Sequence, residues 1–199
     1  QLMKNKLIAV CILSFTLINV NAQRLGIKAG VSLAKGTYEY TDASFSTENL
    51  TGFHAGLIGE VPLSDNVFIN TGALFSMKGT KLNVLGMGVD FSVNYVEIPL
   101  NLAYKYDLGV VKLFGQAGPY AGVGISAKMK GGGEEETLDF GSDSDQIKRI
   151  DYGVNFGAGV EIKKLILGVS YGLGLANMSN DPDETVKNGV LSLSAGLWF

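Results

Sequence analysis

The chain has 199 residues, a formal net charge of −3 and a single cysteine, Cys11. That length suits one undivided all-β sandwich or barrel, and 27 glycines with only 4 prolines are not the composition of a Pro-rich disordered chain. No basic stripe runs along the sequence, which argues against a nucleic-acid partner.

The amino-terminal segment predicts export. Residues 3–22 have a basic start, an apolar run and a small-residue end, which together are typical of a secretory signal peptide. The apolar run is shorter than the roughly 20 residues of a membrane-spanning helix. We therefore expect a signal peptide over 1–22, including a two-residue remnant ahead of Met3, and a mature domain over 23–199. Cys11 falls inside the signal, so the mature chain has no cysteine for a disulfide or a thiol nucleophile.

Eight stretches of the mature chain alternate apolar residues with polar or small ones, which is the two-residue period of β-strands. Their approximate spans are 24–38, 51–62, 67–82, 89–106, 111–129, 147–162, 165–177 and 187–199. In the last stretch, Leu193 and Leu197 share one face while Ser194 and Gly196 share the other. The polar face is poor in bulky side chains, as expected for a narrow lumen. The apolar face would then point outward to hydrocarbon, whereas in a lipocalin-like carrier it would point inward.

The connections between these stretches alternate in length. The short ones are 63–66, 107–110 and 163–164, and the longer ones are 39–50, 83–88, 130–146 and 177–186. Outer-membrane barrels pair short periplasmic turns with longer outer loops, and strands can cross a bilayer only as a closed barrel. The sequence therefore predicts an all-β fold, an eight-stranded antiparallel up-and-down transmembrane β-barrel in the outer membrane of a Gram-negative bacterium.

Strand parity predicts a polar network inside the lumen. Glu97 points inward, and a buried carboxylate needs a partner because an isolated buried charge is costly. Candidate partners with inward parity are Arg24, Lys28, Lys78 and Lys112. The whole predicted lumen network is Arg24, Lys28, Glu97, Asn101, Lys112, Asp151 and Glu161.

Pro99 interrupts the same apolar strand. A closed barrel has no edge strand on which a missing N–H is harmless, so we expect a β-bulge at Pro99. If the 107–110 turn sets the register, Pro99 faces Gly118-Pro119 of the next strand. Both mid-strand prolines would then lie in one irregular patch of the wall.

The stretch Tyr95-Val96-Glu97-Ile98-Pro99-Leu100, followed by alternating apolar residues, resembles the signature of the outer-membrane β-barrel domain family common in Bacteroidetes. That family includes PorT-like proteins and is similar to the eight-stranded OmpX- and OmpA-like barrels. The resemblance covers the mature chain, and its motif residues are Tyr95, Glu97 and Pro99. It implies a barrel surrounded by outer-membrane lipid and lipopolysaccharide. The aromatic end Trp198-Phe199 resembles the signal that the barrel assembly machinery reads during biogenesis.

Aromatic residues near the strand ends predict interfacial girdles. Phe91 lies near an outer strand end, and Tyr104 and Tyr106 lie near the periplasmic ends. Trp198 has inward parity, so we expect it to plug the periplasmic end of the barrel.

His54 is the single histidine, and a lipid A-modifying enzyme would need a Ser and an acid beside it. Parity places His54 on the small, polar face between Gly52 and Gly56, and no Ser-His-acid set emerges from the spacing. A lumen or rim histidine without a catalytic role is the favoured interpretation.

The loop over 131–146 carries six acidic residues and no basic one. Calcium favours oxygen ligands, but the spacing matches no EF-hand, and acidic Gly/Ser-rich loops are mostly solvated. Gly-x-Gly pieces such as Gly122-Val-Gly124 lack the full nucleotide-binding fingerprint. We expect no catalytic residue, no metal and no cofactor.

At eight strands the interior is just filled by side chains, so no open diffusion pore is expected. The sequence favours a non-enzymatic barrel that acts through its outer loops or through an extracellular or envelope protein partner, in a structural, adhesive or secretion-accessory role. A lipid A-modifying enzyme and a PorT-like accessory of protein secretion are the alternatives.

Overall fold

The computed structural model of the protein describes residues 23–40, 43–46, 48–84, 87–132, 134–141, 146–180 and 184–199. The predicted signal peptide over 1–22 lies outside them. The strands are β1 (Arg24–Tyr40), β2 (Ala43–Ser46), β3 (Glu48–Pro62), β4 (Val67–Val84), β5 (Met87–Asp107), β6 (Val111–Gly131), β7 (Glu134–Leu138), β8 (Ile150–Ile162), β9 (Leu165–Gly174) and β10 (Glu184–Trp198). In this part of the chain, no helix combines the length and hydropathy needed to cross a bilayer.

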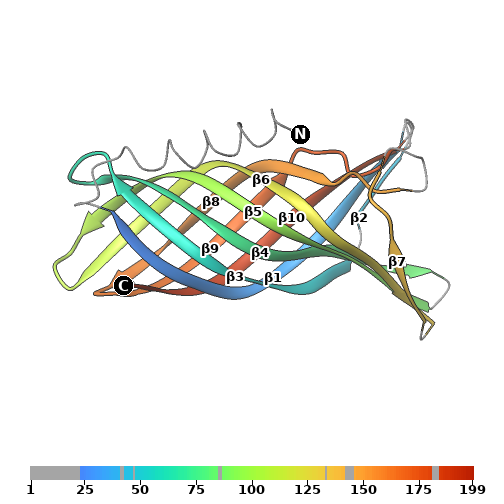
Figure 1. The fold of residues 1–199 in the computed structure, drawn as a ribbon, viewed down its shortest axis with the longest axis horizontal. Coiled ribbons are helices and arrows are strands. Elements are labelled where there is room, and N and C mark those ends of the chain that lie inside the picture. Colours follow the sequence, from blue (N-terminus) through green and yellow to red (C-terminus); the bar gives the residue numbers. More distant parts are fainter. Residues whose placement is uncertain are drawn as a thin grey trace, which may run out of the picture.

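Eight long strands form a closed antiparallel barrel, as predicted (Figure 1). The hydrogen-bonded order runs β10-β9-β8-β6-β5-β4-β3-β1, and β10 pairs with β1 to close the ring. The short strand β2 pairs with β1, and the short strand β7 pairs with β6. These two pairings extend the sheet beyond the eight-stranded barrel. These prolongations occupy parts of the segments 39–50 and 130–146, which the sequence pattern predicted as loops.

The short connections all lie at one end of the barrel, which we call the short-turn end. The register there pairs Arg24 with Glu60 and Gly26 with Trp198, so the first and last strands meet at this end. The turn between β5 and β6 is built by Asp107, whose Oδ1 accepts a 2.7 Å hydrogen bond from the Gly109 N–H. Gly109 has a φ of 91°, a left-handed conformation that glycine adopts without steric cost.

The apolar face of every barrel strand points outward. Phe156, Leu167 and Leu193 are 52%, 42% and 59% exposed, whereas Glu97 and Asp151 are 8% and 1% exposed. The predicted sidedness is therefore confirmed, and the lipocalin-like alternative is wrong. The outer wall is the hydrophobic surface and the lumen is the polar one.

This sidedness reverses along β5 near the opposite end, which we call the long-loop end. On the short-turn side of Tyr95, the outward residues of β5 are apolar and include Ile98, which is 56% exposed. Beyond Tyr95, the outward positions are held by Ser92 and Asp90, while Val93 points inward and is fully buried. The β5–β6 register shifts between Asn94 and Tyr95 at the same level. A β-bulge thus marks the boundary between a wall with an apolar exterior and a sheet with a polar exterior.

Beyond the boundary, the outer face carries a row of alternating charges across five strands. The paired positions run Glu48, Lys81, Asp90, Lys130 and Glu135, from β3 to β7. Lys81 Nζ and Asp90 Oδ1 are 3.4 Å apart. Opposite charges on directly paired residues favour this register over its neighbours.

The inner face beyond the boundary encloses a small hydrophobic core, which we call the long-loop core. Its buried members are Val93, Tyr95, Ala127 and Met178, and Phe91, Leu138, Phe140, Ile147 and Val186 pack against them. Phe140 and Ile147 come from the connection between β7 and β8, and Met178 comes from the connection between β9 and β10. Two connections therefore fold inward and close the lumen at this end with apolar side chains.

The two mid-strand prolines lie at one gap in the β5–β6 ladder, but Pro99 faces Tyr120 and not the predicted Gly118-Pro119, and Pro119 pairs regularly with Val154 of β8. The β5–β6 ladder pairs Pro99 with Tyr120 and resumes at Leu102 with Ala117. The expected bulge is absent because the register is the same on both sides of the gap. Instead, the Thr71 hydroxyl donates a 2.8 Å hydrogen bond to the Pro99 carbonyl, so a side chain replaces part of the interrupted β4–β5 ladder.

Candidate functional site in the lumen and at the long-loop end

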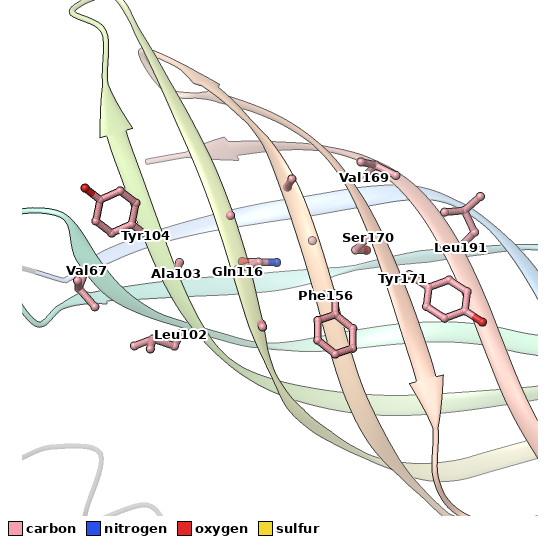
Figure 2. Close-up of a pocket in the computed structure, with 14 residues that line it drawn as sticks. Val67, Leu102, Ala103, Tyr104, Gln116, Phe156, Val169, Ser170, Tyr171 and Leu191 are labelled. Carbon is pink, nitrogen blue, oxygen red and sulfur yellow. The ribbon is translucent and has the colours of Figure 1, made fainter.

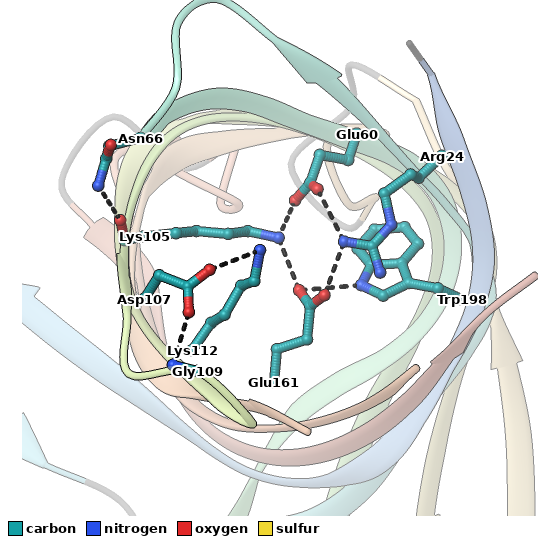
Figure 3. A network of polar contacts seen from close by, with 9 residues as sticks. All are labelled: Arg24, Glu60, Asn66, Lys105, Asp107, Gly109, Lys112, Glu161 and Trp198. Atoms are coloured by element: carbon teal, nitrogen blue, oxygen red, sulfur yellow. Dashed lines mark hydrogen bonds and ion pairs between the residues drawn. The ribbon is translucent and has the colours of Figure 1, made fainter. Parts of the chain in front are cut away.

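Four charged side chains and one tryptophan close the short-turn end, and we call them the short-turn cluster (Figure 3). Arg24 Nη1 lies 2.6 Å from Glu161 Oε1 and 3.4 Å from Glu60 Oε1. Lys105 Nζ pairs with both carboxylates and lies 2.7 Å from Glu161 Oε2. Trp198 Nε1 donates a 3.2 Å hydrogen bond to the same oxygen, and its ring centre lies 4.9 Å from Arg24 Cζ.

This cluster is electrically neutral, because two cations face two carboxylates. Its members come from β1, β3, β5, β8 and β10, so the ion pairs connect strands that are far apart around the ring. Trp198 is 4% exposed and fills the end of the lumen, in agreement with its predicted inward parity. The short-turn end is therefore closed by charge pairing and one indole.

A second group of ion pairs, the central cluster, lies further into the barrel. Lys78 Nζ is 2.5 Å from Glu97 Oε2 and 3.0 Å from Asp151 Oδ2. The same ammonium lies 4.1 Å from the centre of the Tyr120 ring and 5.5 Å from that of Tyr95. Cations are attracted to aromatic faces, and more strongly away from water. The family-motif residues Tyr95 and Glu97 thus both surround Lys78.

Lys28 contributes a lone positive charge between the two clusters. No ion pair or hydrogen bond joins its side chain to another residue in the described part of the chain. It lines two small lumen cavities of about 60 and 50 Å³ together with Asn101, whose buried Oδ1 accepts no hydrogen bond from the described residues. The central cluster has two carboxylates and one cation. When Lys28 is included, the described interior has equal numbers of cationic and anionic side chains. Cavities of this size and polarity suit one or two bound waters.

The ion-pair partners differ in part from the predicted set. Glu97 pairs with Lys78, one of the four candidates. Lys112 is instead 3.1 Å from Asp107 in an exposed pair at the short turn. The Gly109 N–H and the Lys112 ammonium hold the pKa of the Asp107 carboxyl below its usual range. Lys112 therefore belongs to the turn and not to the lumen network, because its position at the start of β6 places it at the rim.

Sequence reasoning missed the partners that complete the short-turn cluster. Glu60 and Lys105 are 1% and 5% exposed and form an ion pair with each other. Lys105 also pairs with Glu161, and Glu60 also pairs with Arg24. Both have inward parity, which is the signal that could have identified Glu60. Parity alone does not say which inward residues lie at the same height across the lumen.

His54 has a serine neighbour inside the lumen. Its Nδ1 is 3.0 Å from Ser32 Oγ, which in turn lies 3.2 Å from Ser192 Oγ. Ser32 and His54 are 1% and 6% exposed, and no carboxylate bonds to His54 within the described residues. The pair therefore satisfies one requirement of a serine nucleophile and lacks both an acid and access for a lipid substrate.

The acidic stretch after β6 is only partly described. Glu134, Glu135 and Glu136 form most of β7 and are exposed, whereas 142–145 lie outside the described residues. Lys128 Nζ is 2.5 Å from Glu135 Oε1 and holds the pKa of that carboxyl below its usual range. Within the part of the chain that is described, no three His, Cys, Asp or Glu side chains gather as metal ligands.

The outer wall carries a broad apolar depression centred on β5, β6, β8 and β9 (Figure 2). Its volume is about 790 Å³. Tyr104, Phe156 and Tyr171 project outward around it, and its floor is formed by small residues such as Gly115 and Ala117. The depression lies in the apolar part of the wall, where acyl chains would fill it.

Comparison with known proteins places this architecture in a family. The family described as "Outer membrane protein beta-barrel domain" matches residues 19–180, and no curated protein matches the chain. The chain is similar to Neisserial surface protein A, with 15% identity, a TM-score of 0.50, and coverage of 88% of this chain and 97% of that one.

The chain is also similar to two further solved structures. OprG from Pseudomonas aeruginosa has 11% identity and a TM-score of 0.50, with 89% of this chain and 96% of that chain covered. Ail, the attachment invasion locus protein of Yersinia pestis, has 19% identity and a TM-score of 0.44, with 89% and 99% covered. The chain therefore belongs to the outer membrane protein β-barrel domain family and is itself an outer-membrane β-barrel.

Proposed function

We propose that this protein is a non-enzymatic barrel of the outer membrane that acts through contacts made at its long-loop end. The observation that supports this proposal most directly is the closure of the lumen at both ends. The short-turn cluster fills one end and the long-loop core fills the other. A lumen closed in this way offers no open path for diffusion, so the surface beyond the membrane is the part available to a partner.

The reversal of sidedness on β5 supports the same proposal. The polar exterior beyond Tyr95 suits water, whereas the apolar exterior around Ile98 suits hydrocarbon. The long-loop end would then project from the cell, and the short-turn end would face the periplasm. Outer-membrane lipid and lipopolysaccharide would surround the apolar wall, and the barrel assembly machinery would read the strand that ends at Phe199.

A lipid A-modifying activity is the less supported alternative. The Ser32–His54 pair points into a closed lumen, on the opposite side of the wall from any lipid. A PorT-like role in secretion is supported only by the motif Tyr95, Glu97 and Pro99. In this barrel Tyr95 and Glu97 surround Lys78 and Pro99 forms the ladder gap, so the motif accounts for interior architecture without invoking a secretion role.

A deletion strain tests these alternatives together. We expect weaker binding of the cells to surfaces or host proteins, with unchanged lipid A composition and unimpaired cargo secretion. Altered lipid A would favour the enzyme, and a secretion defect would favour the PorT-like role. Normal surface binding in the deletion strain would contradict the proposed function.

A further inference from the structure

The strand β7 has one free edge at the long-loop end. It pairs with β6 over five positions, from Ala127 with Leu138 to Gly131 with Glu134. No strand of the described residues pairs with its other edge. Strand β9 pairs with β8 and β10 and ends at Gly174. An open edge presents unpaired N–H and C=O groups that can pair with another strand.

This edge is held in an extended conformation before any partner arrives. Leu138 packs against the long-loop core, which anchors the base of β7. Immediately after the strand, the Ile147 N–H donates a 3.1 Å hydrogen bond to the Asp139 carbonyl, and Phe140 packs against the long-loop core. The Lys128–Glu135 ion pair connects β7 to β6 on the outer face. A preformed strand lowers the entropy that pairing would otherwise cost.

The charge on β7 is uneven between its two faces. Glu135 on the outer face is paired with Lys128. Glu134 and Glu136 share the inner face, because they pair in the ladder with Gly131 and Met129. Both are exposed, and no cation of the described residues forms an ion pair with either. Two carboxylates at alternate positions therefore lie unneutralised beside the free edge.

This charge decides which strand the edge can accept. A second copy of β7 would place carboxylates against carboxylates, and like charges on directly opposed residues are destabilising. A strand with Lys or Arg at alternate positions would place its cations beside Glu134 and Glu136. Cross-strand pairs of opposite charge stabilise strand pairing, in addition to the backbone hydrogen bonds of strand addition.

We propose that the free edge of β7 binds an extended, basic segment of a partner protein by strand addition, with alternate Lys or Arg side chains of that segment beside Glu134 and Glu136. This inference rests on the proposed function, because it specifies one contact at the long-loop end. The partner is a polypeptide, since the backbone groups of the edge require a matching backbone.

A synthetic peptide of alternating Lys and Thr, (Lys-Thr)4, is a suitable probe for the purified full-length barrel in detergent. We expect it to bind and to slow hydrogen exchange at the amides of β7. A (Lys-Thr)4 peptide with every interior amide N-methylated keeps the charge but cannot donate backbone hydrogen bonds, so its binding should be lost. The peptide (Glu-Thr)4 should not bind at all.

Two matched variants locate the contact. The double substitution E134Q/E136Q should weaken (Lys-Thr)4 binding by about tenfold. The control E135Q changes the paired carboxylate on the other face and should change binding by less than about threefold. Both variants should keep the heat-modifiable gel migration of the wild-type barrel, because all three side chains are exposed.

Several results would overturn the inference. Equal binding of the N-methylated peptide would show charge attraction without strand pairing. Equal losses in E135Q and E134Q/E136Q, or exchange protection away from β7, would place the contact elsewhere. If (Lys-Thr)4 does not bind, the three glutamates would serve instead to prevent pairing of this edge with another copy of the chain.

The same variant separates this inference from the function on which it rests. If the deletion strain loses surface binding and the E134Q/E136Q chain fully restores it, then the edge is not the contact and the proposed function still stands. If the deletion strain binds surfaces normally, the proposed function fails whatever the peptide does.

Discussion

Lys78 and Glu97 form an ion pair on the inner face of two adjacent strands, although the ladder does not pair these two residues. Their charged atoms are 2.5 Å apart, while the β4–β5 ladder pairs Glu97 with Leu74 and Lys78 with Val93. The lysine stem therefore runs along the inside of the wall toward the short-turn end. One ammonium thereby reaches two carboxylates, those of Glu97 and Asp151.

Removal of that ammonium should strongly destabilise the barrel. The substitution K78M leaves Glu97 and Asp151 without their cation, and breaking a buried ion pair in this way costs about 3–5 kcal/mol. The free energy of unfolding in urea, measured in lipid vesicles, checks the value. K112M is the matched control, because the Lys112–Asp107 pair is exposed and screened by solvent, and it should contribute little to stability. Similar losses in the two variants would contradict the central cluster as described.

The close approach of β5 and β6 at Gly118 gives a steric prediction. A Cβ at Gly118 would lie 2.0 Å from the Leu100 carbonyl oxygen, whereas a Cβ at Gly115 meets nothing within 4 Å. We expect G118A to lower the free energy of unfolding by about 1–3 kcal/mol, as overpacking does. G115A, on the outward face of the same strand, should fold normally. Heat-modifiable migration across a temperature series compares the two, and an unaffected G118A would mean that the strands are further apart.

The boundary at Tyr95 can be tested with lysine substitutions on either side. Ile98 points outward in the apolar wall, so I98K should cost about 2–4 kcal/mol if that position lies near the bilayer midplane. Asn49 is also exposed but lies among the polar positions beyond the boundary, and N49K should be nearly neutral. Unfolding free energies in vesicles provide the comparison. Equal costs would mean that the reversal of sidedness does not coincide with the membrane surface.

The short turn should respond to acid through Asp107. The Gly109 N–H and Lys112 hold the pKa of this carboxyl below the ordinary value of 3.8. A lowered pKa contributes stability that is present above pH 3.8 and is lost as the pH falls through the lower folded value. Titration of the Asp107 carboxyl by NMR in detergent micelles should give a midpoint below 3.8 in the wild type. In K112M the midpoint should move part of the way back, because the Gly109 hydrogen bond remains.

Much of the barrel could be predicted from the sequence because each spanning strand faces two different solvents. The alternation of Leu193 and Leu197 with Ser194 and Gly196 requires one face to be buried, and the scarcity of bulky side chains shows which one. The same parity placed Glu97 and Asp151 in the lumen and Trp198 at its end. These features depend only on the alternation of residues along each strand, which can be read directly from the sequence.

The features that could not be predicted depend on the position of each residue along the barrel axis relative to residues on distant strands. Parity placed Lys28, Lys78 and Arg24 in one lumen, but the tilt and register of distant strands decide which carboxylate each one meets. Phe91 is a case of a different kind. It was predicted in an interfacial girdle, but it packs inward against the long-loop core. The side chains of β5 still alternate between the two faces beyond Tyr95, but there the inner face is apolar and the outer face is polar.

The two ends of the lumen are sealed by opposite kinds of chemistry. Ion pairs and one indole close the short-turn end, whereas apolar contacts close the long-loop end. Cooling would weaken the apolar contacts of the long-loop core, since hydrophobic association fades at low temperature, and would leave the ion pairs nearly intact. The two ends of the same lumen would therefore respond differently to cooling, and only the closure at the long-loop end would be weakened.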